Sequence, residues 1–182
     1  MEQKEEEKEK ISISQEKLSV SVAITAITAS LYIALGYIFQ PISFYGLQFR
    51  VAELMLGMVM LFPKAGLIGK IIGVFFVNLS SPMVPLDLLS CLVNIPALTC
   101  IILTRDWKFF KYIGATVYAF VIAVYVAWLV NLYFSAPFIL NLIYVFISEE
   151  VLACLSVFLF TIIGKTFTRE QKLKRRHDEK ET

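Results

Sequence analysis

The stretch LSVSVAITAITASLYIALGYIF, residues Leu18–Phe39, decides the fold class, because its 22 residues carry no charged side chain. A helix of this length spans the hydrocarbon core of a bilayer, which is about 30 Å thick. The segment before it, residues 1–17, is rich in glutamate, whereas a cleavable signal peptide has a basic flank and a shorter apolar region. The sequence therefore predicts that the chain is held in a membrane from its first apolar segment.

The composition of the whole chain agrees with this prediction. Hydrophobic residues make up 58% of the 182 residues and charged residues only 18%, and the charges gather in two tails, residues 1–17 and 165–182. A soluble domain needs more polar surface than that. Residues 18–164 are therefore predicted to form one transmembrane domain.

Five further apolar segments follow the first, and the six together predict an all-α membrane protein, a bundle of six transmembrane helices. The five are Leu47–Phe62, Leu67–Leu79, Leu86–Leu103, Ile113–Phe134 and Phe138–Ile163. The second and third segments of the chain are short, with 16 and 13 residues, and a tight break over residues 63–66 separates them. We expect these two to be either two short helices or a hairpin that dips into the bilayer.

The positions of the basic residues predict the orientation, because lysine and arginine concentrate on the cytoplasmic side of membrane proteins. With a cytoplasmic N-terminus, 16 of the 17 basic residues lie on that side, Lys64 and Lys70 among them, and only Arg50 lies outside. The sequence thus predicts a multi-pass protein of the plasma membrane with both termini cytoplasmic. The basic run 172–176 then lies beside anionic headgroups, and a net charge of +2 does not indicate a nucleic-acid surface.

A few ionisable residues inside the apolar segments are the candidates for function, because burying a charge in a membrane requires a partner. Arg50 and Glu53 are three residues apart, which fits either an internal ion pair or a pair of ligand-binding groups. Asp87 begins a polar stripe on the fourth helix that also contains Ser90, Cys91 and Asn94. The stripe fits a ligand site, and a structural network with Asn78 is the alternative.

The last helix carries two adjacent acids, Glu149 and Glu150, near its middle. Neighbouring residues on a helix point about 100° apart. We therefore expect one acid to face the bundle interior and the other to make an interhelical or partner contact. On the fifth helix, Tyr125 and Trp128 fit stacking on a flat ligand, although aromatic residues also gather at the membrane interface.

Small residues recur at every fourth position of the first helix, at Ala26, Ser30 and Ala34. Such spacing lets a partner helix approach closely. The sequence contains no phosphate-binding GxxxxGK[ST] loop, and its only histidine, His177, lies in the C-terminal tail. We therefore expect no enzyme activity, no cofactor, no metal site and no ATP site within the chain itself.

Two stretches carry a family resemblance: TASLYIAL at residues 28–35 and PISFYGLQFRVAE at residues 41–53. They resemble the QueT family, the substrate-binding S components of energy-coupling factor transporters for queuosine precursors. The most specific part is the QFR-x-x-E core of Gln48, Arg50 and Glu53. Asn78, Asp87 and Glu149 also match the family pattern in order and approximate spacing, and the resemblance covers residues 18–164.

The resemblance implies a six-helix protein that captures its ligand from outside and works with a transmembrane coupling protein and two cytoplasmic ATPases. It implies that the first helix packs on the coupling protein through its small residues. For a 7-deazaguanine ligand, Glu149 is expected to accept two parallel hydrogen bonds from the ring N–H and the exocyclic amine. The other expected binding residues are Gln48, Arg50 and Asn78 as donors to the ring carbonyl, Asp87 and Glu53 for an ammonium group, Tyr125 and Trp128 for stacking, and Asn94 of the polar stripe.

Two other functions fit the same residues. One is an S component for another vitamin-like solute, because one fold serves many ligands. The other is a stand-alone ion- or proton-coupled carrier in which Glu53, Asp87 and Glu149 form a relay.

Overall fold

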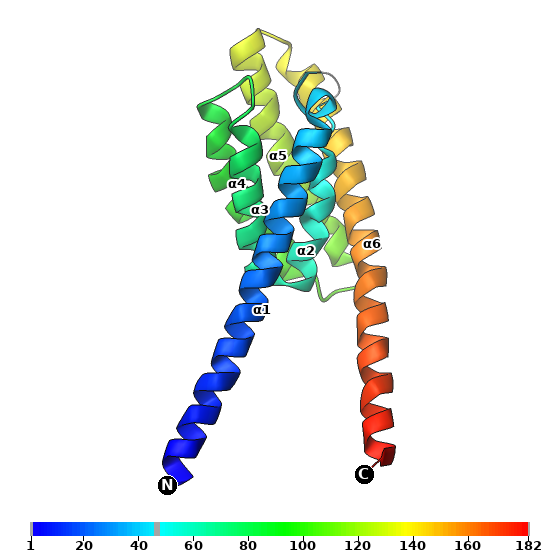
Figure 1. Cartoon of the computed structure of the whole chain (residues 1–182). Helices are drawn as coiled ribbons and strands as arrows, with labels where there is room; N and C mark the ends of the chain where they lie inside the picture. The colour runs from blue at the N-terminus through cyan, green and yellow to red at the C-terminus, as the bar shows by residue number, and fades with distance from the viewer. Residues whose placement is uncertain (1, 46–47, 182) are drawn as a thin grey trace.

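The computed structural model describes residues 2–45 and 48–181, and all regular structure in these ranges is helical. The elements in chain order are α1 (Glu2–Ile38), the π-helical turn η1 (Pro41–Tyr45), the 3₁₀ helix η2 (Val51–Met55), α2 (Leu56–Leu61), α3 (Pro63–Asn78), the 3₁₀ helix η3 (Leu86–Leu89), α4 (Ser90–Thr104), α5 (Phe110–Phe134) and α6 (Phe138–Glu181). Both termini lie at the same end of the molecule, which we call the tail end (Figure 1).

Four helical stretches among the described residues are long and apolar enough to cross a membrane. They are Lys17–Ile38, Leu86–Thr104, Phe110–Phe134 and Phe138–Phe167. Large hydrophobic side chains stay exposed along them, as at Leu31 on α1 and at Ile143 and Val151 on α6. Exposed apolar surface of this extent is stable against lipid and not against water. The all-helical membrane fold class predicted from the sequence is confirmed to this extent, and six transmembrane crossings stay a prediction.

The two short segments form two short helices whose ends differ from the predicted ones. The predicted start at residue 47 lies outside the described residues, and helical structure begins only at Val51. Gln48 has a left-handed backbone with φ 52°, and Arg50 is non-helical with ψ 82°. The break is the single residue Phe62, because Pro63 starts α3 as its first helical residue, where a missing N–H costs nothing.

Close backbone contacts hold these short helices against the long ones. A Cβ on Gly57 of α2 would lie 2.1 Å from the Phe160 ring of α6, so only glycine fits there. Next to it, Ser156 Oγ donates to Leu54 O at 2.6 Å and accepts from Gly57 N at 2.7 Å. A Cβ on Gly69 of α3 would lie 2.6 Å from Thr25 O of α1. These contacts bring α2 against α6 and α3 against α1.

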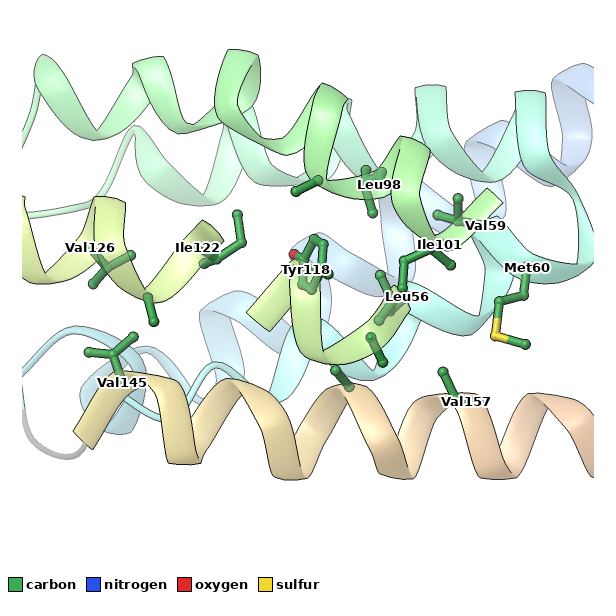
Figure 2. Packing of buried hydrophobic residues seen from close by; sticks show 14 of the residues in the cluster. Leu56, Val59, Met60, Leu98, Ile101, Tyr118, Ile122, Val126, Val145 and Val157 are labelled. Atoms are coloured by element: carbon green, nitrogen blue, oxygen red, sulfur yellow. The ribbon is translucent and has the colours of Figure 1, made fainter. Parts of the chain in front are cut away.

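The apolar core lies mainly between α2, α4, α5 and α6 (Figure 2). Leu56, Leu98 and Val126 have no exposed surface within it. A second apolar cluster joins α1 to α3 and η2 through Tyr32, Ala52 and Val74. Buried polar residues lie among these two clusters, so they are enclosed by packed side chains on all sides.

The tails have no boundary in secondary structure, because α1 and α6 run through the composition changes at residues 17 and 165.

One sequence interpretation was wrong: Lys70 is fully buried in α3, not on the cytoplasmic side. Lys70 lies about 10 Å along α3 from the first helical residue, Pro63. At that depth the Glu53 carboxylate neutralises its charge. Arg50 is 7% exposed and belongs to the interior too. The orientation of the termini stays a prediction that rests on the other basic residues.

Candidate binding site

The candidate site is a group of buried polar side chains inside the bundle. Five buried residues among those described are ionisable acids or bases: Arg50, Glu53, Lys70, Asp87 and Glu149. Glu53 belongs to η2, and Arg50 directly precedes that helix. Lys70 lies on α3, Asp87 on η3 and Glu149 on α6. Charges in such surroundings are stable only when other charges or hydrogen bonds neutralise them. The partners of each group therefore show what the site can bind.

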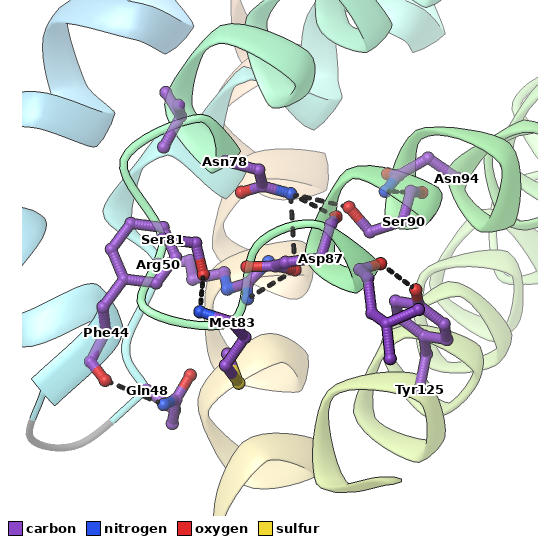
Figure 3. A network of polar contacts seen from close by, with 12 residues as sticks. Phe44, Gln48, Arg50, Asn78, Ser81, Met83, Asp87, Ser90, Asn94 and Tyr125 are labelled. Atoms are coloured by element: carbon purple, nitrogen blue, oxygen red, sulfur yellow. Dashed lines mark hydrogen bonds and ion pairs between the residues drawn. The ribbon is translucent and has the colours of Figure 1, made fainter. Parts of the chain in front are cut away.

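Arg50, Asn78, Asp87 and Ser90 form the first group, the Arg50–Asp87 cluster (Figure 3). Arg50 Nη2 lies 3.8 Å from Asp87 Oδ1, an ion pair longer than a hydrogen bond. Asn78 Nδ2 donates to Asp87 O at 3.0 Å and to Ser90 Oγ at 2.6 Å. The Arg50 guanidinium also lies over the Phe44 ring, 5.5 Å from its centroid. The alternative interpretation of the polar stripe, a structural network with Asn78, is therefore present in the structure.

Tyr32, Glu53, Lys70 and Tyr118 form the second group, the Glu53–Lys70 cluster. Lys70 Nζ donates to Glu53 Oε2 at 2.6 Å, and the Tyr118 hydroxyl donates to the same oxygen at 2.6 Å. The Tyr32 hydroxyl donates to Glu53 Oε1 at 2.7 Å. Lys70 Nζ also lies 4.3 Å from the centroid of the Tyr118 ring. Every charged atom of this cluster is satisfied, so it fixes four helical elements in place.

Asn94 of α4 connects the two clusters. Its Nδ2 donates to Ser90 O at 2.9 Å, and its Oδ1 lies 3.1 Å from the Tyr118 hydroxyl. The polar stripe is confirmed as an inward-facing row, because Asp87, Ser90, Cys91 and Asn94 are all buried.

The alternative of an internal ion pair between Arg50 and Glu53 was wrong. Arg50 pairs with Asp87, and Glu53 pairs with Lys70. The three-residue spacing would bring the two side chains together on an α-helix, but Arg50 is the non-helical residue before η2. The backbone therefore sends the two side chains into different clusters.

Glu149 is the acid of α6 that faces the interior. It has no exposed surface, and neither carboxylate oxygen has a hydrogen-bond partner among the described residues. Its electrostatic neighbours are Glu53, Arg50 and Lys70, which places it beside both clusters. Glu150 turns to the contact between α5 and α6, where Thr116 Oγ1 donates to its Oε1 at 2.8 Å. The expected division between the two acids is confirmed.

Several other buried polar atoms around Arg50 also lack a hydrogen-bond partner in the described part of the chain. The acceptors are Gln48 Oε1 and Asp87 Oδ2, and the donors are Nε and Nη2 of Arg50. A buried unsatisfied polar atom costs about 1–3 kcal/mol. Counted with the two Glu149 oxygens, these unsatisfied atoms are four acceptors and two donors. This balance is complementary to a small molecule that carries several N–H groups and one acceptor.

A comparison with known protein families assigns the chain to a family over nearly the whole transmembrane region. The sequence pattern that defines the QueT transporter family matches residues 22–165. The chain belongs to the QueT transporter family. Searches among curated proteins and among solved structures gave no match.

The QueT match covers every residue of the two clusters and Glu149, and it ends where the charged C-terminal tail begins. Ionisable groups inside a membrane protein destabilise a purely structural core unless they are neutralised. The buried polar interior is therefore the candidate solute-binding region of this QueT chain.

The remaining expected residues lie outside the two clusters, and they differ in how exposed they are. Tyr125 is half-buried, and its hydroxyl donates to Leu86 O at the start of η3. Trp128 is 45% exposed on the outer side of α5, so the structure does not bring it together with the buried residues. Ala26, Ser30 and Ala34 are all exposed on α1, which leaves that face available to another helix.

Sequence reasoning missed Tyr32, Lys70 and Tyr118 as members of the polar interior. Lys70 was assigned to the tail end, although it follows Gly69 within an apolar segment. That position was itself a signal, because a lysine among apolar residues needs a buried acid as its partner. The two tyrosines lie in mid-helix, away from the interface belt where tyrosine is common.

Proposed function

We propose that this chain is the substrate-binding S component of an energy-coupling factor transporter, and that it captures a 7-deazaguanine precursor of queuosine. The observation that carries the proposal is Glu149, a fully buried carboxylate whose two oxygens have no hydrogen-bond partner among the described residues. A carboxylate buried in this way is stable only when a proton or a donor-rich ligand neutralises it.

The charge balance of the interior supports a ligand with a positive charge or a donor edge. The buried side chains include three carboxylates, Glu53, Asp87 and Glu149, but only two cations, Arg50 and Lys70. The Glu53–Lys70 pair is complete in itself, which leaves Arg50 between two acids. One additional donor group near Glu149 would balance the site.

A 7-deazaguanine presents the required groups on one flat ring. Its ring N–H and exocyclic amine form a donor edge that a carboxylate accepts in two parallel hydrogen bonds, the role proposed for Glu149. Its ring carbonyl accepts from Arg50, whose Nε and Nη2 make no hydrogen bond to the described residues. In the aminomethyl form, the ammonium group is proposed to bind Asp87, whose Oδ2 is also unpartnered. Glu53 is saturated by three donors, so its proposed role is to support the site.

The site lies toward the end of the molecule opposite the tails, where α3 ends at Asn78 and η3 begins at Leu86 (Figure 1). With cytoplasmic tails, this end faces the exterior and suits capture from outside. Asp87 and Glu149 have no exposed surface. The protein must therefore open at this end before a ligand can reach them.

The proposed partners are a transmembrane coupling protein and two cytoplasmic ATPases, in the plasma membrane. The exposed small residues Ala26, Ser30 and Ala34 of α1 support this, because they permit close contact with a partner helix. The sequence has no phosphate-binding loop of its own, so ATP-driven uptake requires a partner that binds ATP.

The test is direct binding of the aminomethyl 7-deazaguanine to the purified chain, measured by calorimetry. Glu149→Gln should weaken binding about 100-fold, because a hydrogen bond to a charged group is worth about 1.5–3 kcal/mol and two are affected. Glu150→Gln is the matched control and should bind like the parent chain. Equal binding by the parent chain and Glu149→Gln would contradict the proposal.

A thermal-shift screen with other vitamin-like solutes separates this ligand from the alternatives. Stabilisation by a chemically unrelated vitamin, and none by a 7-deazaguanine, would assign a different substrate to the same site. Uptake into vesicles that lack the ATPases would favour the stand-alone carrier instead.

A further inference from the structure

A second feature lies far from the polar interior, in an open pocket at the tail end. Its volume is about 510 Å³, and it lies between α1, the break at Phe62 and the end of α4. The Thr25 hydroxyl of α1 donates to Ala65 O of α3 at 3.2 Å and holds two walls of the pocket together. The pocket shares no lining residue with the Arg50–Asp87 or Glu53–Lys70 cluster.

Three basic residues from three different elements line this pocket: Lys17, Lys64 and Arg105. Among the described residues its lining contains no acid, and Arg105 Nε lies 3.5 Å from Oδ2 of the neighbouring Asp106. That pair is solvent-exposed and leaves most of the guanidinium free to bind an anion. The pocket therefore concentrates positive charge.

The rest of the pocket wall is apolar. Val20 and Phe62 line it and are 54% and 40% exposed, and Leu61 is half-buried beside them. The level of the pocket is that of the lipid headgroups, because the membrane-crossing stretch of α1 begins at Lys17 and that of α4 ends at Thr104. A site at this level has charged groups on its aqueous side and apolar groups on its membrane side.

We propose that this pocket binds one anionic phospholipid, with its phosphate held by Lys17, Lys64 and Arg105 and the start of an acyl chain on Val20, Leu61 and Phe62. Arginine and lysine bind phosphate through charge-assisted hydrogen bonds, and basic pockets between membrane helices bind anionic headgroups. A free phosphate would not use the apolar wall. An acidic segment of a partner protein would pair with the three cations but leave the apolar wall uncovered.

The lipid would connect three parts of the chain at this end: α1, the α2–α3 junction and the connection after α4. Its binding is therefore independent of solute capture in the interior and of the proposed substrate. The proposal requires only that the helices cross a membrane.

The experiment uses the full chain in detergent micelles and measures lipid adducts by native mass spectrometry. Phosphatidylglycerol is titrated against phosphatidylcholine of the same acyl chains. The parent chain should retain one phosphatidylglycerol with at least about tenfold preference, because three cations contribute to binding. The triple variant Lys17→Gln, Lys64→Gln, Arg105→Gln should lose this preference.

The matched control removes three positive charges at other exposed positions, Lys108→Gln, Lys165→Gln and Arg169→Gln. The control should keep the single preferred adduct, and glycerol 3-phosphate at millimolar concentration should not displace it. Loss of the preference in both triple variants, or displacement by glycerol 3-phosphate, would show general charge attraction and overturn the proposal. Unchanged lipid preference in the pocket variant, with loss of co-purification with a coupling protein, would assign the pocket to protein docking and overturn it too.

Discussion

Lys70 Nζ and Glu53 Oε2 lie 2.6 Å apart in the interior of the bundle, where Lys70 has no exposed surface. The pair joins α3 to η2, and Tyr32 and Tyr118 extend it to α1 and α5. A buried ion pair contributes little net stability, but removing one partner leaves an uncompensated charge. The pair therefore specifies how the short helices lie against the long ones and supports the site proposed for the ligand.

Lys70→Met should destabilise the protein by about 3–5 kcal/mol, because it leaves the Glu53 carboxylate buried without its cation. The measurement is the free energy of unfolding in mixed micelles. The double variant Lys70→Met, Glu53→Gln should recover at least about 1 kcal/mol of this loss, because the unpaired charge is gone. A double variant less stable than Lys70→Met alone would contradict this account of the pair.

Arg50→Lys should weaken binding of the aminomethyl 7-deazaguanine about tenfold, although the charge is kept. Lysine lacks the planar fork that lets arginine contact Asp87 on one side and the ligand carbonyl on the other. Calorimetry of the purified protein checks this result. Arg105→Lys, at the tail end, is the matched control and should bind normally. Normal binding by Arg50→Lys would remove Arg50 from the proposed site.

Ala34→Leu should reduce co-purification with the coupling protein at least about tenfold, because a bulky side chain on α1 keeps a partner helix at a distance. Binding of the solute should be unchanged, since Ala34 is exposed on the outside of α1. Thr99→Leu adds a bulky side chain to an exposed position of α4 and should assemble normally. Equal loss of assembly in both variants would argue against α1 as the partner face.

Gly57→Ala should destabilise the fold by about 1–3 kcal/mol, because the new Cβ would overlap the Phe160 ring and force α2 away from α6. Gly164→Ala is a milder change, since its Cβ would meet only the flexible end of Leu61, at 2.9 Å. Thermal unfolding in micelles should rank the two variants in that order. Similar midpoints for both would show that α2 can move without cost.

Much of the candidate site could be predicted from the sequence, because ionisable residues inside apolar segments are conspicuous. Asp87 and Asn94 of the polar stripe are buried, and one of the two adjacent acids of the last helix faces inward, as expected. The pairing of the acids and bases could not be predicted in the same way. Spacing along the chain favoured Arg50 with Glu53, but Arg50 lies in irregular backbone whose direction depends on what it packs against.

The sequence by itself determined the membrane class, the helical segments and the supply of buried charges, because hydrophobic length and composition are properties of the chain alone. Only the tertiary structure decided that Lys70 neutralises Glu53, that Glu149 faces inward and Glu150 does not, and that Arg50 lies in irregular backbone before η2. The reason is that a charge in a low-dielectric interior selects its partner by distance in space, and residues far apart in sequence approach each other only after the helices have packed.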